Sequence, residues 1–375
     1  MTEGWRQWVE GQLDAVRGAG RWRTPRSFDG SGPEGTLVST GQQVVSFASN
    51  DYLGLTSHPA VVDAAHRALD RWGAGSGAAR LIVGSRPIHG ELEEALAQWK
   101  GTERAVLFPT GFAANLGVLA ALAGPGTRVV SDELNHASII DGCRLSRADV
   151  AVYRHGDVDH AAALLKGAHR AIVVTDVVFS MDGDVAPVVE LAAVCSRTGT
   201  LLVLDEAHAV LGPDLDPILD AARVEVLRVG TLSKTLGSLG GFVACAAPYA
   251  ELLVNRARPY IFTTASTPAD TAGALAALGV LRSKEGEALV ARLRAHVARV
   301  RPGHPSPIVP VMLGAEDRAL AAAARLLDEG LLVPAIRPPT VPPGSSRLRV
   351  ALSAAHTDEQ VARLCAALDR LYAAA

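Results

Sequence analysis

Between residues 46 and 270, short apolar runs alternate with longer amphipathic stretches, and this alternation most restricts the fold. The runs at 105–108, 128–131, 150–153, 171–175, 201–204, 226–229 and 241–246 have the length of β-strands. Strands that alternate with helices imply a mostly parallel sheet with helices on both faces. The pattern therefore predicts an α/β fold whose main part, residues 46–271, is one large sheet domain.

The chain on either side of this region has a different character. Residues 1–45 predict a short helix followed by an arm, because periodicity is weak after Gly18. Around the turn-rich segment 301–307 the alternation of strands and helices continues on a smaller scale, which predicts a second α+β domain at 272–375. A chain of 375 residues is long enough for two domains with sizeable cores.

Two helices have clear end signals. Pro59 is suited to the first position of a helix, and Gly73 is suited to the position that ends it. Between them lies an apolar stripe at Val61, Ala65, Leu69 and Trp72. In the last helix, Thr357 and Gln360 form a capping box in which each side chain satisfies a free backbone N–H. The apolar face predicted after it consists of Val361, Leu364, Cys365, Leu368 and Leu371.

Charge and cysteine content exclude several classes of protein. The formal net charge of −3 gives no basic surface for nucleic acid or for a membrane. The four cysteines are widely spaced and lack the pairing typical of zinc sites, so we expect reduced thiols and no metal. No apolar run approaches the ~20 residues of a membrane span, and the N-terminus has no signal-peptide pattern. We expect a cytoplasmic protein.

Two strand ends together predict the chemistry. Asp205 and His208 follow the run at 201–204, and Lys234 follows the run at 226–229. Taken singly, the first pair suits an acidic surface turn and the lysine a solvated side chain. Taken together they suit a pyridine cofactor, because a carboxylate pairs with the protonated ring nitrogen and a lysine forms an imine with the aldehyde carbon. Partial burial and nearby cations would favour the neutral amine that a nucleophile requires.

Other strand ends supply further candidates for the same edge of the sheet. Gly111 and Phe112 begin a helix after a strand, where backbone N–H groups and the helix dipole favour an anion such as phosphate. His136 and Ser180 each follow a strand as well, although an ordinary histidine and a plain turn would look the same. Ligands of open α/β sheets bind beyond the carboxyl ends of the strands, so these residues are expected to converge.

Together these motifs resemble those of the fold-type I pyridoxal-5′-phosphate (PLP) enzymes, and among them the α-oxoamine synthases. The motifs are residues 110–112, His136, Ser180, 205–208 and 231–234. The resemblance extends from the segment 47–55 to the segment 347–356. Enzymes of this family condense an amino acid with an acyl thioester and release CO₂. The resemblance implies that Lys234 holds PLP, that Asp205 pairs with the ring nitrogen, that His136 stacks on the ring and that His208 contacts the phenolic oxygen. It places further cofactor contacts at Gly111, Phe112, Ser180, Thr231 and Ser233, and at Thr264 toward a partner subunit's cofactor.

The segment 335–344 resembles the branch of the family that uses L-alanine and a pimeloyl thioester, carried on acyl carrier protein or CoA. On this basis Arg337 is expected to bind the amino-acid carboxylate, a task suited to a guanidinium fork. Arg23 is expected near the acyl substrate, although Arg21 and Arg26 fit the same pattern. Other substrate contacts implied are Asn50, Ser76, His136 and Thr340. The family also implies a homodimer.

Two departures and four rival interpretations accompany the resemblance. After His208 the chain continues with Ala209 and a loop shorter than the family's glycine-rich one, and the stretch 77–80 is a local variant. A sister synthase such as glycine C-acetyltransferase would share the cofactor residues, and so would an aminotransferase or lyase. A non-catalytic PLP-binding regulator is disfavoured by the intact set of Lys234, Asp205, His136 and His208. A cofactor-free α/β protein would leave the strand-end residues a coincidence.

Overall fold

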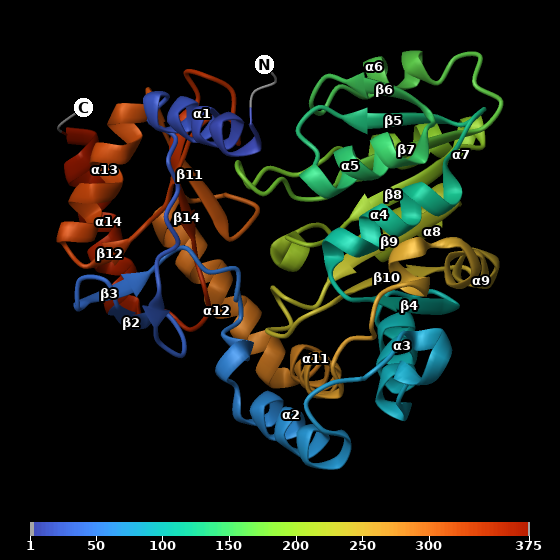
Figure 1. Ribbon diagram of the computed structural model, residues 1–375, viewed down its shortest axis with the longest axis horizontal. Helices are drawn as coiled ribbons and strands as arrows, with labels where there is room; N and C mark the ends of the chain where they lie inside the picture. Colours follow the sequence, from blue (N-terminus) through green and yellow to red (C-terminus); the bar gives the residue numbers. More distant parts are fainter. Residues whose placement is uncertain (1–3, 374–375) are drawn as a thin grey trace.

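A seven-stranded sheet forms the centre of the larger lobe in the computed structural model, which describes residues 4–373 (Figure 1). Its strand order is β4-β10-β9-β8-β7-β5-β6. The strands are β4 (Arg104–Phe108), β5 (Arg128–Asp132), β6 (Asp149–Tyr153), β7 (Ala171–Asp176), β8 (Leu201–Asp205), β9 (Val226–Thr231) and β10 (Gly241–Cys245). Only β10 runs antiparallel to its neighbours within this sheet. The predicted mostly parallel α/β sheet is confirmed.

Helices cover both faces of this sheet because successive strand residues point to opposite sides. Val106 and Phe108 pack into one apolar cluster while Ala105 and Leu107 belong to another. The helices of this lobe are α3 (Pro87–Trp99), α4 (Gly111–Leu122), α5 (Ala137–Ser146), α6 (Val158–Leu164), α7 (Val188–Thr198), α8 (Leu215–Ala222), α9 (Ala247–Arg256) and α10 (Arg258–Ile261). Within residues 4–373, no helix combines the length and the apolarity needed to cross a membrane.

The smaller lobe is built from both ends of the chain (Figure 1). Its C-terminal part contains α12 (Lys284–Val300), β11 (Ile308–Gly314), α13 (Glu316–Asp328), β12 (Leu331–Leu332), β13 (Ala335–Ile336), β14 (Ser346–Ala351) and α14 (Asp358–Ala373). Its N-terminal part contains α1 (Trp5–Gly18), β1 (Phe28–Asp29), β2 (Glu34–Leu37) and β3 (Gln42–Ser46), and β3 pairs with β12. The predicted arm after Gly18 thus contains three short strands that the sequence analysis missed.

A pair of helices connects the two lobes, namely α2 (Pro59–Trp72) and α11 (Pro268–Leu281) (Figure 1). The predicted ends of α2 are confirmed, but its predicted stripe is partly wrong. Val61, Ala64 and Ala68 are buried, whereas Leu69 is 42% exposed. The reason is that α11 packs closely against α2, and small residues at 64 and 68 permit this approach.

The capping box that begins α14 is present as predicted. The Thr357 backbone N–H donates to Gln360 Oε1 at 3.0 Å, and the Gln360 N–H donates to Thr357 Oγ1 at 3.2 Å. Val361, Leu364 and Leu368 on the predicted apolar face are buried. The helix is therefore anchored at its first turn and along one side.

Candidate active site

Lys234 lies at the end of β9 and contacts a buried histidine at the end of β8. Its Nζ is 2.9 Å from His208 Nε2, and His208 Nδ1 is 2.6 Å from the Tyr52 hydroxyl. Burial lowers the pKa of Lys234 against the opposing effect of the Asp205 carboxylate. Burial and the neighbouring Lys234 hold the pKa of His208 well below its ordinary value. The pair therefore combines a neutral imidazole with an amine that loses its proton more readily than an exposed lysine.

Asp205, the last residue of β8, is a buried carboxylate with fixed orientation. Its Oδ2 accepts a hydrogen bond from Asn115 Nδ2 at 2.6 Å, and its Oδ1 accepts one from the Ala207 N–H at 2.9 Å. On the adjacent strand, burial and the charge of Asp205 raise the pKa of Asp176 well above its usual range. Asp176 therefore tends toward its neutral form beside Asp205.

His136 caps the start of α5 above this pair of acids. Its backbone N–H donates to Asp176 Oδ2 at 2.8 Å, and its Nδ1 lies 2.7 Å from Ser138 Oγ. Its ring meets the Phe112 ring edge-on, with 6.1 Å between centroids. Burial lowers its pKa, and the nearby Lys234 acts in the same direction. An uncharged aromatic ring at this position suits stacking on a planar ligand.

A small anion cradle is formed where α4 begins next to the end of β9. The N–H groups of Gly111 and Phe112 belong to the first turn of α4, which leaves them without helical acceptors. A Cβ on Gly111 would lie 3.1 Å from the Thr231 Cβ, so glycine lets the two elements approach. The Thr231 and Ser233 hydroxyls lie 2.7 Å apart beside it. Amide donors, hydroxyls and a helix N-terminus together favour a phosphate group.

Arg349 is a site residue that the sequence reasoning missed. It is buried at 6% exposure in β14, its Nε donates to the Ser180 carbonyl at 2.6 Å, and its Nη2 donates to Asn50 Oδ1 at 3.1 Å. Its charge contributes to the lowered pKa of both Lys234 and His208. Its place in a strand pattern, before Val350 and Ala351, was the available signal, because charged residues are rarely buried without a specific partner.

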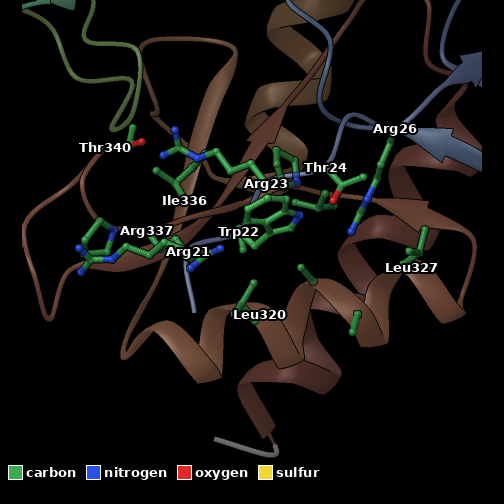
Figure 2. Close-up of a pocket in the computed structure, with 16 residues that line it drawn as sticks. Arg21, Trp22, Arg23, Thr24, Arg26, Leu320, Leu327, Ile336, Arg337 and Thr340 are labelled. Carbon is green, nitrogen blue, oxygen red and sulfur yellow. The ribbon is translucent and has the colours of Figure 1, made fainter. Parts of the chain in front are cut away.

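Arg337, Arg23 and Thr340 lie apart from this cluster, around a groove of about 650 Å³ between the N-terminal segment and α13 (Figure 2). Arg337 Nη1 donates to the Gly20 carbonyl at 2.7 Å and approaches Glu316 at 3.5 Å. Arg23 and Arg26 are exposed on the groove wall. None of the strand-end residues around Lys234 lines this groove.

The predicted residues Ser76 and Thr264 lie where residues 76–79 contact residues 264–266. Ser76 is buried and its hydroxyl donates to the Ser266 carbonyl at 2.6 Å. Thr264 is exposed and forms an isolated β-bridge with Ala79. Neither side chain forms a hydrogen bond to Lys234 among residues 4–373.

The comparisons with known proteins show to which family this chain belongs. Residues 42–368 match the family model described as aminotransferase class I and II. A curated relative from Anaeromyxobacter dehalogenans, named 8-amino-7-oxononanoate synthase, is 50% identical over 98% of this chain and 96% of its own length. The chain belongs to the 8-amino-7-oxononanoate synthase family. It is accordingly a PLP-dependent acyltransferase of biotin synthesis.

Two solved structures extend the family assignment to the fold. A serine palmitoyltransferase from S. paucimobilis, solved with a bound PLP–myriocin aldimine, is 30% identical and superposes with a TM-score of 0.89 over 98% of this chain and 97% of its own. An 8-amino-7-oxononanoate synthase from Francisella tularensis is 26% identical, with a TM-score of 0.73 over 88% of this chain and 96% of its own. The fold is therefore that of the fold-type I PLP transferases.

Proposed function

We propose that this member of the 8-amino-7-oxononanoate synthase family condenses L-alanine with a pimeloyl thioester. The products are 8-amino-7-oxononanoate, CO₂ and the free thiol of the carrier, which is acyl carrier protein or CoA. The observation that carries the proposal is the contact of Lys234 with His208, next to the buried Asp205, in a chain 50% identical to a curated synthase.

The residues at the strand ends fit each chemical part of PLP. The anion cradle at Gly111, Phe112 and Thr231 suits the phosphate, and the Asp205 carboxylate suits a protonated ring nitrogen. His136 offers a ring for stacking, and Lys234 offers an amine of lowered pKa for the aldehyde. When bound, PLP supplies an electron-withdrawing ring that accepts negative charge from the substrate Cα.

We assign binding of the alanine carboxylate to Arg349 and retain Arg337 as the competing assignment. The charge of Arg349 lowers the pKa of Lys234 and of His208, so its guanidinium lies close to the reactive amine. Hydrogen bonds to the Ser180 carbonyl and to Asn50 fix its orientation. A fixed fork of donors binds a carboxylate with little loss of side-chain freedom. Lys234 Nζ then takes the proton from Cα of the bound alanine, a task that its lowered pKa supports.

A second groove, of about 680 Å³, suits the acyl chain. Ser180 and Met181 line one side, and the loop 338–343, which includes Thr340, lines the other. Arg21 lines both this groove and the groove of Figure 2. Pro338 and Thr340 line both grooves as well, which supports the proposal that an anionic donor approaches along Arg23 and Arg26.

We further propose that the enzyme is a homodimer. Leu81, Ile82 and Val83 are 50%, 74% and 68% exposed, and Phe262 is 69% exposed. This apolar patch adjoins Thr264 through its bridge to Ala79. A contiguous patch of exposed apolar side chains usually marks a protein–protein interface. The patch thus supports the expectation that Thr264 faces the site of a second copy.

The test is product formation by purified protein supplied with PLP. L-alanine with pimeloyl-CoA or with pimeloyl-acyl carrier protein should yield 8-amino-7-oxononanoate by mass spectrometry. Glycine with acetyl-CoA is the comparison reaction. If glycine with acetyl-CoA yields product and alanine with either pimeloyl thioester does not, the enzyme has the activity of the sister synthase. Keto acid formed without consumption of the thioester would instead indicate an aminotransferase.

A further inference from the structure

A histidine outside the site described above is held by two carboxylates that belong to different strand ends. His155 follows β6, and its Nδ1 is 3.0 Å from Asp132 Oδ1 at the end of β5. Its Nε2 is 2.7 Å from Asp184 Oδ2 in the segment 179–184, which follows β7 and is called here the 179–184 loop. The His155 ring also meets the Phe179 ring edge-on, with 4.4 Å between centroids.

The two contacts require two N–H donors, and the imidazolium form provides both. Hydrogen bonds to Asp132 and Asp184 raise the pKa of His155 to about 10. Because this value lies above the ~6.5 of an unfolded histidine, the stability that the contacts contribute is full below pH ~6.5 and is lost as pH rises through about 10. Other titratable groups nearby are Glu133, which accepts the His155 backbone N–H at 2.9 Å, and His304, which lies against the loop.

The 179–184 loop is in turn the point where the two lobes meet beside the site. Gly183 has φ +70°, and a Cβ there would lie 2.0 Å from the Ile308 carbonyl oxygen, so the loop contacts the start of β11 directly. Asp182 forms an ion pair with Arg347. The Ser180 carbonyl accepts the 2.6 Å hydrogen bond from Arg349. Displacement of this loop would therefore move Arg349.

A continuous set of hydrogen bonds links this loop to the reactive amine. Arg349 donates to Asn50 Oδ1, which also accepts from the Tyr52 hydroxyl at 3.2 Å. Tyr52 contacts His208, and His208 contacts Lys234. We propose that His155 is a positioning residue: held between Asp132 and Asp184, it fixes the 179–184 loop, and through Ser180 it sets the orientation of Arg349 toward the amino-acid substrate. The substrate part of this inference rests on the proposed function.

The kinetic test is His155→Gln in the full-length enzyme, with His160→Gln as the matched control on α6. Glutamine has one amide donor group and cannot replace the cationic link to two carboxylates. We expect the KM for L-alanine to rise about tenfold, with kcat and the KM for the thioester within about twofold of wild type. Asp184→Asn, which removes one charge and keeps an acceptor, should shift the alanine KM in the same direction by a smaller factor.

Equal losses for both substrates, or an unchanged alanine KM, would overturn the positioning role. A second measurement tests the link independently of activity. Nitrogen-15 NMR of the histidine side chains at pH 8 should find both His155 ring nitrogens protonated, and a neutral ring would contradict the inference. If wild-type protein makes no product from alanine, the proposed function fails while the NMR result still decides whether the link exists.

Discussion

The cluster around Lys234 and the groove of Figure 2 both contain several basic side chains, but these are held in different ways. His208 and Arg349 are buried, Lys234 is half-buried, and each has a hydrogen-bond partner from another element. Arg23 and Arg26 are exposed, and neither has a side-chain partner among residues 4–373.

This difference suggests that the cluster around Lys234 carries out the reaction, whereas the groove of Figure 2 attracts an anionic substrate. Burial is the main cause of the lowered pKa values of Lys234 and His208, and the neighbouring Arg349 charge lowers both further. Exposed arginines are screened by salt within about 10 Å and attract anions without fixing them in one orientation. Substitutions in the first region should therefore change turnover or the binding of alanine, and substitutions at Arg23 and Arg26 in the second should change only the binding of an anionic donor.

The largest effect is expected from Lys234→Ala. Removal of the amine that takes the Cα proton should lower kcat on the order of 10⁴-fold, and the visible absorption of bound PLP should change as well. Lys166→Ala, at an exposed lysine of the same lobe, is the control and should retain wild-type turnover. Retention of turnover by the Lys234 variant would remove the basis for the proposed mechanism.

Asp205→Ala should rank second. Without a carboxylate at the ring nitrogen, kcat should fall by about 10²- to 10³-fold. The loss of folding free energy should be only ~1–3 kcal/mol, because the Asn115 amide and the Ala207 N–H lose their acceptor. Thermal unfolding, measured together with the kinetics, separates the loss of turnover from the loss of stability. A variant that fails mainly by unfolding would show that Asp205 acts as a structural residue.

The arginine assignment is decided by a matched pair, Arg349→Lys and Arg337→Lys. Lysine keeps the charge but cannot form the two-pronged contact with a carboxylate. We expect the alanine KM to rise about 10- to 100-fold for Arg349→Lys and less than about threefold for Arg337→Lys. The reverse order would support the original prediction for Arg337 and would assign the Figure 2 groove to the amino acid.

The dimer proposal is tested by Ile82→Asp, with Val38→Asp as the control at a separate exposed valine. An acid in an apolar interface loses its hydration, so light scattering should find the Ile82 variant monomeric at micromolar concentration while the control stays dimeric. A wild-type protein that is itself monomeric would exclude any role of Thr264 in a partner's site.

The smallest effect is expected from the double variant Arg23→Ala and Arg26→Ala. The KM for the pimeloyl thioester should rise about threefold at low ionic strength and approach the wild-type value at high salt. The KM for alanine should not change. Arg144→Ala, at another exposed arginine, controls for a general loss of positive charge. A thioester KM indifferent to both arginines would show that the donor does not use the Figure 2 groove.

The sequence predicted best where local pattern alone determines structure. The predicted strand 201–204 is β8 to within one residue, since an apolar run ends where Asp205 turns polar. Prediction from the sequence failed where packing between distant segments determines the structure. Leu69 is exposed because α11 meets the alanine face of α2, and the second edge of β3 is covered by the distant strand β12, which sequence pattern does not reveal. Arg349 was missed for the same reason, because its partners Ser180 and Asn50 lie far away in the chain.

The central claim is that Lys234 carries the cofactor, and chemical trapping tests it most directly. Protein incubated with PLP and then reduced with borohydride should carry one added cofactor mass, and peptide mapping should place it on Lys234. Bound mass on another lysine, or none at all in folded protein, would contradict the account of the site.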